Sequence, residues 1–393
     1  MGLAATPELR RSPTRKPIPL LDLEAQQRPI RDEILAAVTR VIDSRQFILG
    51  EEVRQLEEEI ASYCGTAYAI GCASGSDALF LALLALGIGP GDAVLTTPFT
   101  FFATAGEISR IGATPVFADV AEQTFNLDPN LLGEKLATRP ASSPRIRAIL
   151  PVHLFGGCAD MDAICELAEA RGIAVIEDAA QAIGAEYRGR RAGSLGRLGC
   201  FSFYPTKNLG ALGDGGILTT NDAELAGRLR ALRVHGSTNK YVHQWIGINS
   251  RLDALQAAAL RVKLPHLDGW SEGRARNAAR YRERLRSSGV TCPVPTSYQS
   301  RHIYNQFTIR HPERDGLQAH LKKHGIGSEV YYPLPLHLQP CYAGLGYRRG
   351  DFPVAEKLAA ECLSLPVQAE LTTEDIDFVC DVILAYRPNR SES

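Results

Sequence analysis

Apolar side chains recur at helical spacing near the start of the chain. From Ile30 to Ile42 they fall on one face of a helix, and polar residues occupy the other face. The segment Phe47-Ile-Leu-Gly50 interrupts this pattern, and a second helical pattern runs from Glu51 to Tyr63. The sequence therefore predicts two consecutive helices, of which the first is amphipathic.

Beyond these helices, short apolar runs alternate with helical segments. Five of the runs are predicted as strands: Tyr68–Cys72, Ala93–Thr96, Thr114–Phe117, Ala148–His153 and Ala174–Glu177. Strands that alternate with helices are typical of a parallel or mixed sheet covered by helices on both faces. The predicted fold class is therefore α/β.

A different pattern begins near Ser250. Apolar residues from Leu252 onward indicate a long helix, which Pro265 interrupts and which resumes to about Leu285. The rest of the chain predicts a smaller α+β unit with strands near His302–Ile309 and Gly327–Tyr331 and helices near Leu317–Lys323 and Val354–Leu363.

The 393 residues are enough for two domains. We expect a large α/β domain over residues 17–264, which includes the N-terminal helices, and a small C-terminal α+β domain over 265–393. Residues 1–16 carry four basic residues but no apolar core. They are predicted to be a disordered tail and not a secretory signal.

Composition narrows the class of protein. The net charge of -1 gives no global field that would attract nucleic acid or a membrane surface. No apolar run reaches the roughly 18 residues that a membrane span needs. The nine cysteines are scattered and lack metal-ligand spacing, so we predict no metal site. Reduced thiols of this kind fit a cytoplasmic enzyme.

The segment Ala73-Ser-Gly-Ser-Asp77 directly follows the first predicted strand and opens a helix. Ser74, Gly75 and Ser76 place small residues and free backbone N–H groups at the helix N-terminus, which is a suitable phosphate site. The same residue types also serve as ordinary helix caps. Its place in the first strand-to-helix turn of the large domain favours the phosphate site.

Two further segments follow strand ends. Phe101, in the run Thr97-Pro-Phe-Thr-Phe-Phe-Ala-Thr104, can lie flat on a cofactor ring, or it can belong to the core. Asp178 ends a buried strand, where α/β proteins place ligand-binding groups, although a structural role fits it equally. Gln181 falls on the same face as Asp178 if the chain turns helical there. It can bond a phenolate-type oxygen or be a surface residue.

Lys207 lies in a loop that is apolar before it and glycine-rich after it. The run Cys200-Phe-Ser-Phe-Tyr-Pro205 precedes it, and four glycines follow between residues 210 and 216. Most loop lysines are simply solvated. Here the aromatic run predicts a partly desolvated amine, which loses its proton more readily. Ser202 lies on the preceding strand and can add a phosphate contact.

A desolvated lysine and a strand-end acid are the two protein groups that pyridoxal phosphate requires. The lysine forms a Schiff base with the cofactor, and the acid pairs with its protonated pyridine nitrogen.

A fifth segment, Asn249-Ser-Arg-Leu-Asp253, opens the long helix. Asn249 or Ser250 is a good N-cap for that helix, which would explain the segment without any function.

Five segments occur in the order found in the sugar-nucleotide aminotransferases of the DegT/DnrJ/EryC1/StrS family, which the chain therefore resembles. They are Ala73-Ser-Gly-Ser-Asp77, Glu177-Asp-Ala-Ala-Gln181, Ser202-Phe-Tyr-Pro-Thr-Lys-Asn208, Gly213-Asp-Gly-Gly216 and Asn249-Ser-Arg-Leu-Asp253. The resemblance extends from Ile18-Pro-Leu-Leu-Asp-Leu23 to about Leu384. It implies the fold of aspartate aminotransferase, which is fold type I of the pyridoxal phosphate enzymes, with a large mixed-sheet domain and a smaller C-terminal domain. It also implies a transaminase that uses pyridoxal 5'-phosphate and passes through pyridoxamine phosphate.

The resemblance assigns roles to matching positions. Lys207 matches the Schiff-base lysine and proton shuttle, and Asp178 matches the acid that holds the pyridine nitrogen protonated. Gln181 matches the residue that bonds the phenolic oxygen, and Phe101 the stacking aromatic. The expected phosphate ligands are Gly75, Ser76, Ser202 and, from the neighbouring subunit, Asn249. A ligand from the neighbour implies a homodimer with shared active sites.

The resemblance further implies an amino donor, by analogy glutamate, and a keto-sugar nucleotide as acceptor. Some members carry histidine in place of the lysine and dehydrate sugars, so Lys207 argues for transamination. The loop Val330-Tyr-Tyr-Pro-Leu-Pro-Leu-His337 resembles that of members that aminate C-3. Tyr332 and His337 are candidates to contact the sugar, and Arg251 to contact the diphosphate.

Other interpretations remain open at this point. The loop can be a proline-rich connector, and Arg251 can form a surface salt bridge. The acceptor can be a 4-keto sugar, a cyclitol or the precursor of an aminobenzoate. A regulatory protein of the same fold without turnover is a different class of function, which the presence of Lys207, Asp178 and Gln181 disfavours. A dehydrogenase would need Gly-x-Gly-x-x-Gly in the first strand-to-helix turn, and the chain lacks it.

Overall fold

The computed structural model describes residues 16–138, 140 and 142–387. The predicted disordered tail therefore lies outside the described residues, apart from Lys16. None of the helices in the described part of the chain is long and apolar enough to span a membrane.

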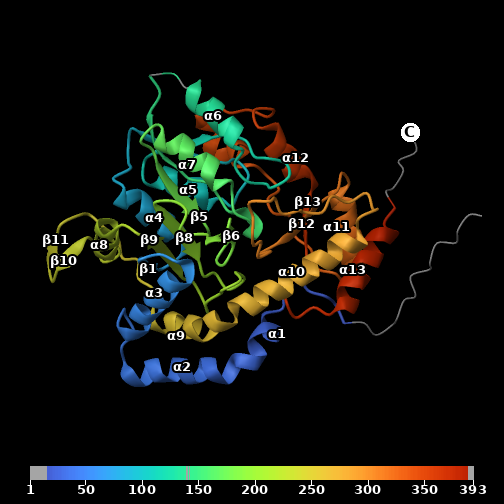
Figure 1. Ribbon diagram of the computed structural model, residues 1–393, viewed down its shortest axis with the longest axis horizontal. Helices are drawn as coiled ribbons and strands as arrows, with labels where there is room; N and C mark the ends of the chain where they lie inside the picture. The colour runs from blue at the N-terminus through green and yellow to red at the C-terminus, as the bar shows by residue number, and fades with distance from the viewer. Residues whose placement is uncertain (1–15, 139, 141, 388–393) are drawn as a thin grey trace, which may run out of the picture.

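A seven-stranded sheet forms the centre of the larger part of the molecule (Figure 1). Its strands are β1 (Tyr68–Cys72), β2 (Asp92–Thr96), β3 (Thr114–Phe117), β4 (Arg145–Ile149), β5 (Ala174–Asp178), β8 (Leu198–Ser202) and β9 (Gly216–Thr220). They lie in the order β1-β9-β8-β5-β4-β2-β3, and β9 alone pairs antiparallel, with both of its neighbours. The sheet is therefore mixed, as the sequence predicted.

Three two-stranded pairs complete the strands of the described residues. They are β6 (Glu186–Tyr187) with β7 (Arg190–Arg191), β10 (Ser237–Asn239) with β11 (Val242–His243), and β12 (Phe307–Arg310) with β13 (Cys362–Leu365). The β10–β11 hairpin projects from the edge of the molecule beside α8 (Figure 1).

Helices precede, separate and follow these strands. The α-helices are α1 (Leu23–Gln27), α2 (Arg31–Ser44), α3 (Glu51–Cys64), α4 (Gly75–Ala85), α5 (Ala103–Arg110), α6 (Pro129–Ala137), α7 (Met161–Glu169), α8 (Ala223–Leu232), α9 (Ala254–Lys263), α10 (Leu267–Arg284), α11 (Arg314–Lys323), α12 (Pro353–Glu361) and α13 (Thr373–Ala385). Short 3-10 turns are η1 (Arg28–Ile30), η2 (Leu154–Gly156), η3 (Leu264–His266), η4 (Leu336–Leu338) and η5 (Pro340–Leu345).

Helices cover both faces of the sheet. Successive strand side chains point to opposite faces, so Val175 of β5 packs in one apolar core and Ile176 in another. The first core also contains side chains of α3, α7 and α9, and the second contains side chains of α4 and α8. Burial on both faces explains why these strands are almost continuously apolar.

Most of the predicted strands match the structure, but two are too long. The one predicted near His302–Ile309 starts only at Phe307, as β12. The strand predicted at Ala148–His153 ends at Ile149, as β4. Pro151 has no N–H to donate to a ladder, and the chain beyond it keeps only a single bridge, between Val152 and Asp178. β9 was not predicted, because Gly216 and the glycines before it are typical of a loop.

The long helix after residue 250 is confirmed, including its interruption at Pro265, but its predicted cap is wrong. The helix starts at Ala254, and the N-cap position is Asp253. Asn249 instead pairs with Val234 in a single bridge, and the Ser250 Oγ atom accepts the Ala73 N–H at 3.1 Å. These contacts keep the chain extended at the two positions predicted as caps.

The C-terminal part has its own apolar core, formed by α10, α11, α13, β12 and β13. Ile18 also belongs to this core and forms a bridge with Ile326, so the start of the described chain packs against its end. The strand predicted at Gly327–Tyr331 is wrong, because this segment keeps one bridge, Glu329 to Ser364. The division of the chain at residue 264 stays a prediction.

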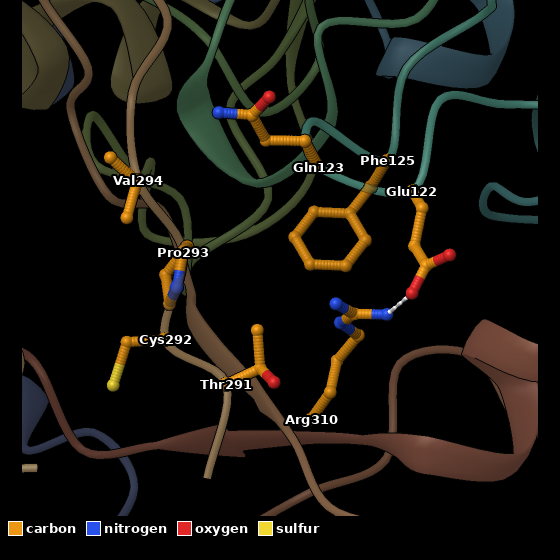
Figure 2. Close-up of a pocket in the computed structure, with 8 residues that line it drawn as sticks. All are labelled: Glu122, Gln123, Phe125, Thr291, Cys292, Pro293, Val294 and Arg310. Carbon is orange, nitrogen blue, oxygen red and sulfur yellow. Dashed lines mark hydrogen bonds and ion pairs between the residues drawn. The ribbon is translucent and has the colours of Figure 1, made fainter. Parts of the chain in front are cut away.

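Carboxylates on the loop after β3 hold the C-terminal part against the sheet. Figure 2 shows Arg310 of β12 directed toward Glu122, with which it forms an ion pair, beside a hollow lined by Phe125 and Val294. Lys357 of α12 contacts the same carboxylate at 2.7 Å. Asp119 accepts the N–H groups of Val354 and Ala355 in the first turn of α12, at 2.9 and 3.0 Å.

The end of β5 is fixed by a buried carboxylate. Glu177 is fully buried, and its Oε1 atom accepts the N–H groups of Leu195 and Gly196 at 2.8 and 2.7 Å. Its Oε2 atom accepts the Gly193 N–H at 2.7 Å and bonds His153 Nε2 at 2.9 Å. The His153 Nδ1 atom accepts the Ala159 N–H, so the ring proton lies on Nε2 and is donated to Glu177. Four donors thus satisfy one buried carboxylate.

We expect Glu177→Gln to lower the free energy of unfolding by about 3 kcal/mol, because an amide cannot accept all four donors in a buried site. Chemical denaturation of the purified protein measures this change. The matched control is Glu166→Gln, on the exposed face of α7, which should change stability by less than about 0.5 kcal/mol. Equal effects of the two substitutions would contradict the role given to Glu177.

Candidate active site

A cavity of about 510 Å³ opens at the carboxyl ends of β5 and β8, next to the start of α4. This volume is typical of small-molecule sites. Nine of the predicted site residues line it: Ser74, Gly75, Ser76, Phe101, Asp178, Gln181, Ser202, Lys207 and Tyr332. Parallel strands place their carboxyl ends at one edge of the sheet, which is why segments distant in sequence meet here.

The N-terminus of α4 forms one end of the cavity. Ser74 is its N-cap, and the Oγ atom of Ser74 accepts the Asp77 N–H at 3.1 Å. A β-carbon at Gly75 would lie 2.6 Å from the Ser202 Cβ atom, so only glycine allows this approach. The approach brings the Ser202 hydroxyl next to the first N–H groups of the helix. Together they form a cradle for a phosphate group.

Asp178 lies at the end of β5 and is 4% exposed. Its Oδ2 atom accepts the Thr104 hydroxyl at 2.7 Å, and its Oδ1 atom accepts the Ala180 N–H at 3.2 Å. Burial raises the pKa of this carboxyl group, while these two bonds and the nearby Lys207 amine oppose the rise. In the described part of the chain no lysine or arginine forms an ion pair with it. A buried carboxylate in this position suits a cationic ligand.

Lys207 lies in the loop between β8 and β9. The loop is tied by the Phe203 N–H, which donates to Gly215 O at 2.8 Å, and by the Lys263 Nζ atom, which donates to Gly210 O at 2.6 Å. Burial lowers the pKa of the Lys207 amine to about 8, against the opposing effect of the Asp178 carboxylate. A substantial fraction of this amine is therefore neutral near pH 8, as a Schiff-base lysine requires.

Gln181 joins two walls of the cavity. Its Oε1 atom accepts the Phe155 N–H at 2.7 Å, and its Nε2 atom donates to the Tyr332 hydroxyl at 3.1 Å. The sequence placed Gln181 on the same face as Asp178 only if the chain became helical there. Residues 179–185 form turns and not a helix. Gln181 nevertheless reaches the cavity that Asp178 lines. The Phe101 ring is 57% exposed and lies 6.1 Å from that of Tyr332, so one face is free to meet a ligand.

Three predicted residues do not line this cavity. Asn249 is exposed, in the segment bridged to Val234, and Arg251 is half-buried two residues further on. His337 is buried, with its Nε2 atom 3.1 Å from a Glu356 oxygen and its ring 4.7 Å from that of Phe352. This packing places His337 among residues that do not line the cavity, and its contact with the sugar stays a prediction.

Several lining residues were missed from the sequence. They are Leu79, Thr100, Ala103, Thr104, Val152, Leu154, Ala180, Tyr204, Thr206, Asp214, Gln306 and Tyr331. Thr104 is the most informative of them, because it bonds Asp178. It is the last residue of the run Thr97–Thr104, which also contains Phe101. Its hydroxyl at the start of the following helix was the only feature of the sequence that could have indicated a polar role. Its partner, 74 positions away, could not be inferred.

The residues present fit pyridoxal phosphate. The cradle at α4 suits its phosphate, the buried Asp178 carboxylate suits its pyridinium nitrogen, and the Lys207 amine suits its aldehyde. These groups line one cavity, and none of them is engaged in a strong ion pair within the described residues. The assignment of each residue to its part of the cofactor is a proposal.

Comparison with known proteins identifies the family. The model of the DegT/DnrJ/EryC1/StrS aminotransferase family matches residues 28–384. The chain belongs to this family. A protein of Geobacillus stearothermophilus named "Pleiotropic regulatory protein" is 51% identical over 371 residues, which cover 94% of this chain and 98% of that protein.

A further relative is named as an aminotransferase, and another is a solved structure. A UDP-N-acetyl-3-dehydro-alpha-D-glucosamine 3-aminotransferase of Acidithiobacillus ferrooxidans is 47% identical over 367 residues, which cover 93% of this chain and 97% of that protein. The crystal structure of DesV of S. venezuelae, in complex with a ketimine intermediate, matches with a TM-score of 0.90 at 46% identity. The match covers 94% of this chain and 98% of DesV.

These findings confirm the fold class and the type of enzyme. This member of the DegT/DnrJ/EryC1/StrS family has the fold type I architecture of pyridoxal phosphate enzymes and is a pyridoxal phosphate-dependent transaminase.

The pKa of Lys207 predicts how fast the cofactor-free protein captures pyridoxal phosphate. Since only the neutral amine reacts, the rate should rise about tenfold from pH 6 to 7 and less than about twofold from pH 8 to 9. The visible absorption of the bound cofactor follows the reaction. Free Nα-acetyl-lysine is the control, because its amine should still gain about tenfold from pH 8 to 9. A parallel rise for both amines would contradict the lowered pKa.

Proposed function

We propose that this transaminase moves an amino group from an amino acid, with glutamate as the expected donor, to the 3-keto group of a hexose carried on a nucleoside diphosphate. The main support is the 47% identity, over nearly the whole length, to a relative named as a 3-aminotransferase of a 3-dehydro sugar nucleotide. The lining of the cavity by Tyr331 and Tyr332, from the loop that resembles C-3 aminating members, agrees with this proposal.

Most of the predicted residues that line the cavity are assigned to binding the cofactor. When bound, pyridoxal phosphate supplies the aldehyde that joins the amine and the ring that accepts electrons as the Cα–H bond breaks. Ser74, Gly75, Ser76 and Ser202 hold the phosphate, and Gln181 bonds the phenolic oxygen. Phe101 covers one face of the ring. Each of these roles uses hydrogen-bonding or packing groups that face the cavity.

Lys207 and Asp178 carry the chemistry. The neutral Nζ atom of Lys207 would take the proton from the Cα atom of the amino donor and pass it to the cofactor carbon that carries the nitrogen. In the second half-reaction it would move a proton the opposite way, to the sugar carbon that receives the amino group. Asp178 provides a fixed negative charge at the end of β5, which stabilises positive charge on a ring nitrogen. Tyr332, bonded to Gln181 at 3.1 Å, extends the wall toward the acceptor sugar.

The two halves of the site are proposed to come from two chains. We infer a homodimer in which Asn249 supplies a phosphate contact to the partner's cavity and Arg251 lies near the substrate diphosphate. In support, Asn249 is exposed and does not reach the cavity of its own chain. A cytoplasmic enzyme of sugar-nucleotide metabolism is the cellular role that fits this reaction.

A regulatory role without turnover is the second candidate, because the relative from Geobacillus stearothermophilus carries a regulatory name. It predicts that no substrate is converted even when the cofactor is bound. The presence of Lys207, Asp178 and Gln181 around one cavity favours catalysis.

The acceptor is tested with a panel of matched substrates. The enzyme is run in reverse with 2-oxoglutarate and 3-amino or 4-amino sugar nucleotides, an aminocyclitol and an aminobenzoate, and glutamate formation is measured. We expect the 3-amino sugar nucleotide to give a kcat/KM at least about tenfold above the others. A preference for a 4-amino sugar, a cyclitol or an aminobenzoate would refute the proposed acceptor. Lys207→Ala is the control and should be inactive with all of them.

Mixing of inactive variants tests the shared site. Lys207→Ala and Asn249→Ala homodimers should each have low activity, the first without the amine and the second through loss of cofactor. After subunit exchange, a mixed dimer contains one site with both residues intact, so activity should recover to about a quarter of the wild-type value for statistical mixing. Absence of recovery, with exchange shown by mass spectrometry, would favour a site built from one chain.

A further inference from the structure

Thr104 makes the shortest contact to the acid of the site. It lies in the first turn of α5 and is 1% exposed. Its Oγ1 atom donates to the Asp178 Oδ2 atom at 2.7 Å, within the range of a hydrogen bond to a charged oxygen. The sequence assigned a role to Phe101 of the same run but none to Thr104.

A second threonine extends this hydrogen bond. The Thr100 Oγ1 atom lies 3.1 Å from the Thr104 Oγ1 atom, and both are buried. A hydroxyl has one proton, and the Thr104 proton is committed to Asp178. Thr100 must therefore be the donor to Thr104. The two hydroxyls form a chain that points toward the carboxylate, an arrangement that stabilises the ionised form of Asp178.

The other surroundings of Asp178 give it little support as an anion. Burial raises its pKa, and the Thr104 bond is the largest of the contacts that oppose the rise. The Ala180 N–H, the Lys207 amine and His153 follow in that order. The Cys200 thiol and the Tyr332 phenol also face Asp178, and burial raises the pKa of both, so they stay neutral. When Lys207 is neutral, Thr104 is the strongest remaining side-chain support.

We propose that Thr104 is a positioning residue that keeps Asp178 ionised and turned toward the ring nitrogen of pyridoxal phosphate. This inference rests on the proposed role of Asp178. Without the Thr104 hydroxyl, the proton shared by the two groups moves from the ring nitrogen to the Asp178 oxygen. The N–H bond breaks, an O–H bond forms, and both groups become neutral. A neutral ring withdraws less electron density than a protonated ring, so it stabilises the charge left by the breaking Cα–H bond less well.

The test uses the holoenzyme loaded with pyridoxal phosphate that carries ¹⁵N in its ring. The ¹⁵N chemical shift, measured by solid-state NMR at pH 7.5, reports directly whether this nitrogen carries a proton. For Thr104→Val, which keeps the shape of the side chain but removes the donor, we expect the ratio of the two proton positions to change by about 10- to 100-fold. The shift should move toward that of neutral pyridine, and kcat should fall by a similar factor with less change in KM.

Three variants provide controls. Thr104→Ser keeps a hydroxyl at the same position and should keep the protonated shift. Thr100→Val removes only the outer hydroxyl and should have a smaller effect than Thr104→Val. Asp178→Asn provides the reference shift for a ring nitrogen without its acid. A structural role for Thr104 in packing α5 would not move the ¹⁵N shift.

The possible outcomes distinguish failure of the role proposed for Thr104 from failure of the role proposed for Asp178. A protonated wild-type nitrogen with an unchanged shift in Thr104→Val would overturn the role of Thr104 and leave that of Asp178 intact. An unprotonated nitrogen in the wild type would overturn the role of Asp178, and the inference for Thr104 with it. A protonated wild type, a shifted Thr104→Val and a restored Thr104→Ser would establish Thr104 as the residue that keeps the acid ionised.

Discussion

The hydrogen bonds to the buried Glu177 carboxylate hold the centre of this molecule in place. Successive residues of a strand face opposite sides, so fixing Glu177 on one side of β5 directs Asp178 to the other side, toward the cavity. The same carboxylate binds the loop at residues 193–196, which leads directly into β8 and the lysine loop. One buried carboxylate therefore helps to set the positions of both groups that are proposed to carry the chemistry.

The antiparallel strand β9 has a similar effect. Because β9 returns beside β8, the lysine loop is a short connection between neighbours and not a helical crossover. β1, which also pairs with β9, ends directly before the Ser74 cap. The amine and the phosphate cradle thus lie on adjacent strands, at a separation that the sheet geometry determines.

The sequence predicts the local parts of this arrangement well. β1 and β3 match their predicted bounds, and Lys207 and Asp178 line one cavity, because apolar periodicity and strand-end polarity are local signals. The Thr104–Asp178 bond and the packing of His337 against Phe352 could not be predicted from local patterns, because each contact joins segments that are separated in sequence. The cap predicted at Asn249 failed because a bridge to Val234 outweighs its intrinsic preference.

The junction between the sheet and the C-terminal part has a consequence for how such enzymes diverge. Tyr331 and Tyr332 belong to a segment that carries no strand or helix and is held by neighbouring packing, such as that of α12 on Asp119. Lys207 and Asp178 are anchored separately, through the sheet. Substitutions in residues 331–335 can therefore reshape this wall of the cavity while the amine and the acid keep their positions. The contacts that hold the amine and the acid and the residues that form this wall therefore lie on separate stretches of the chain.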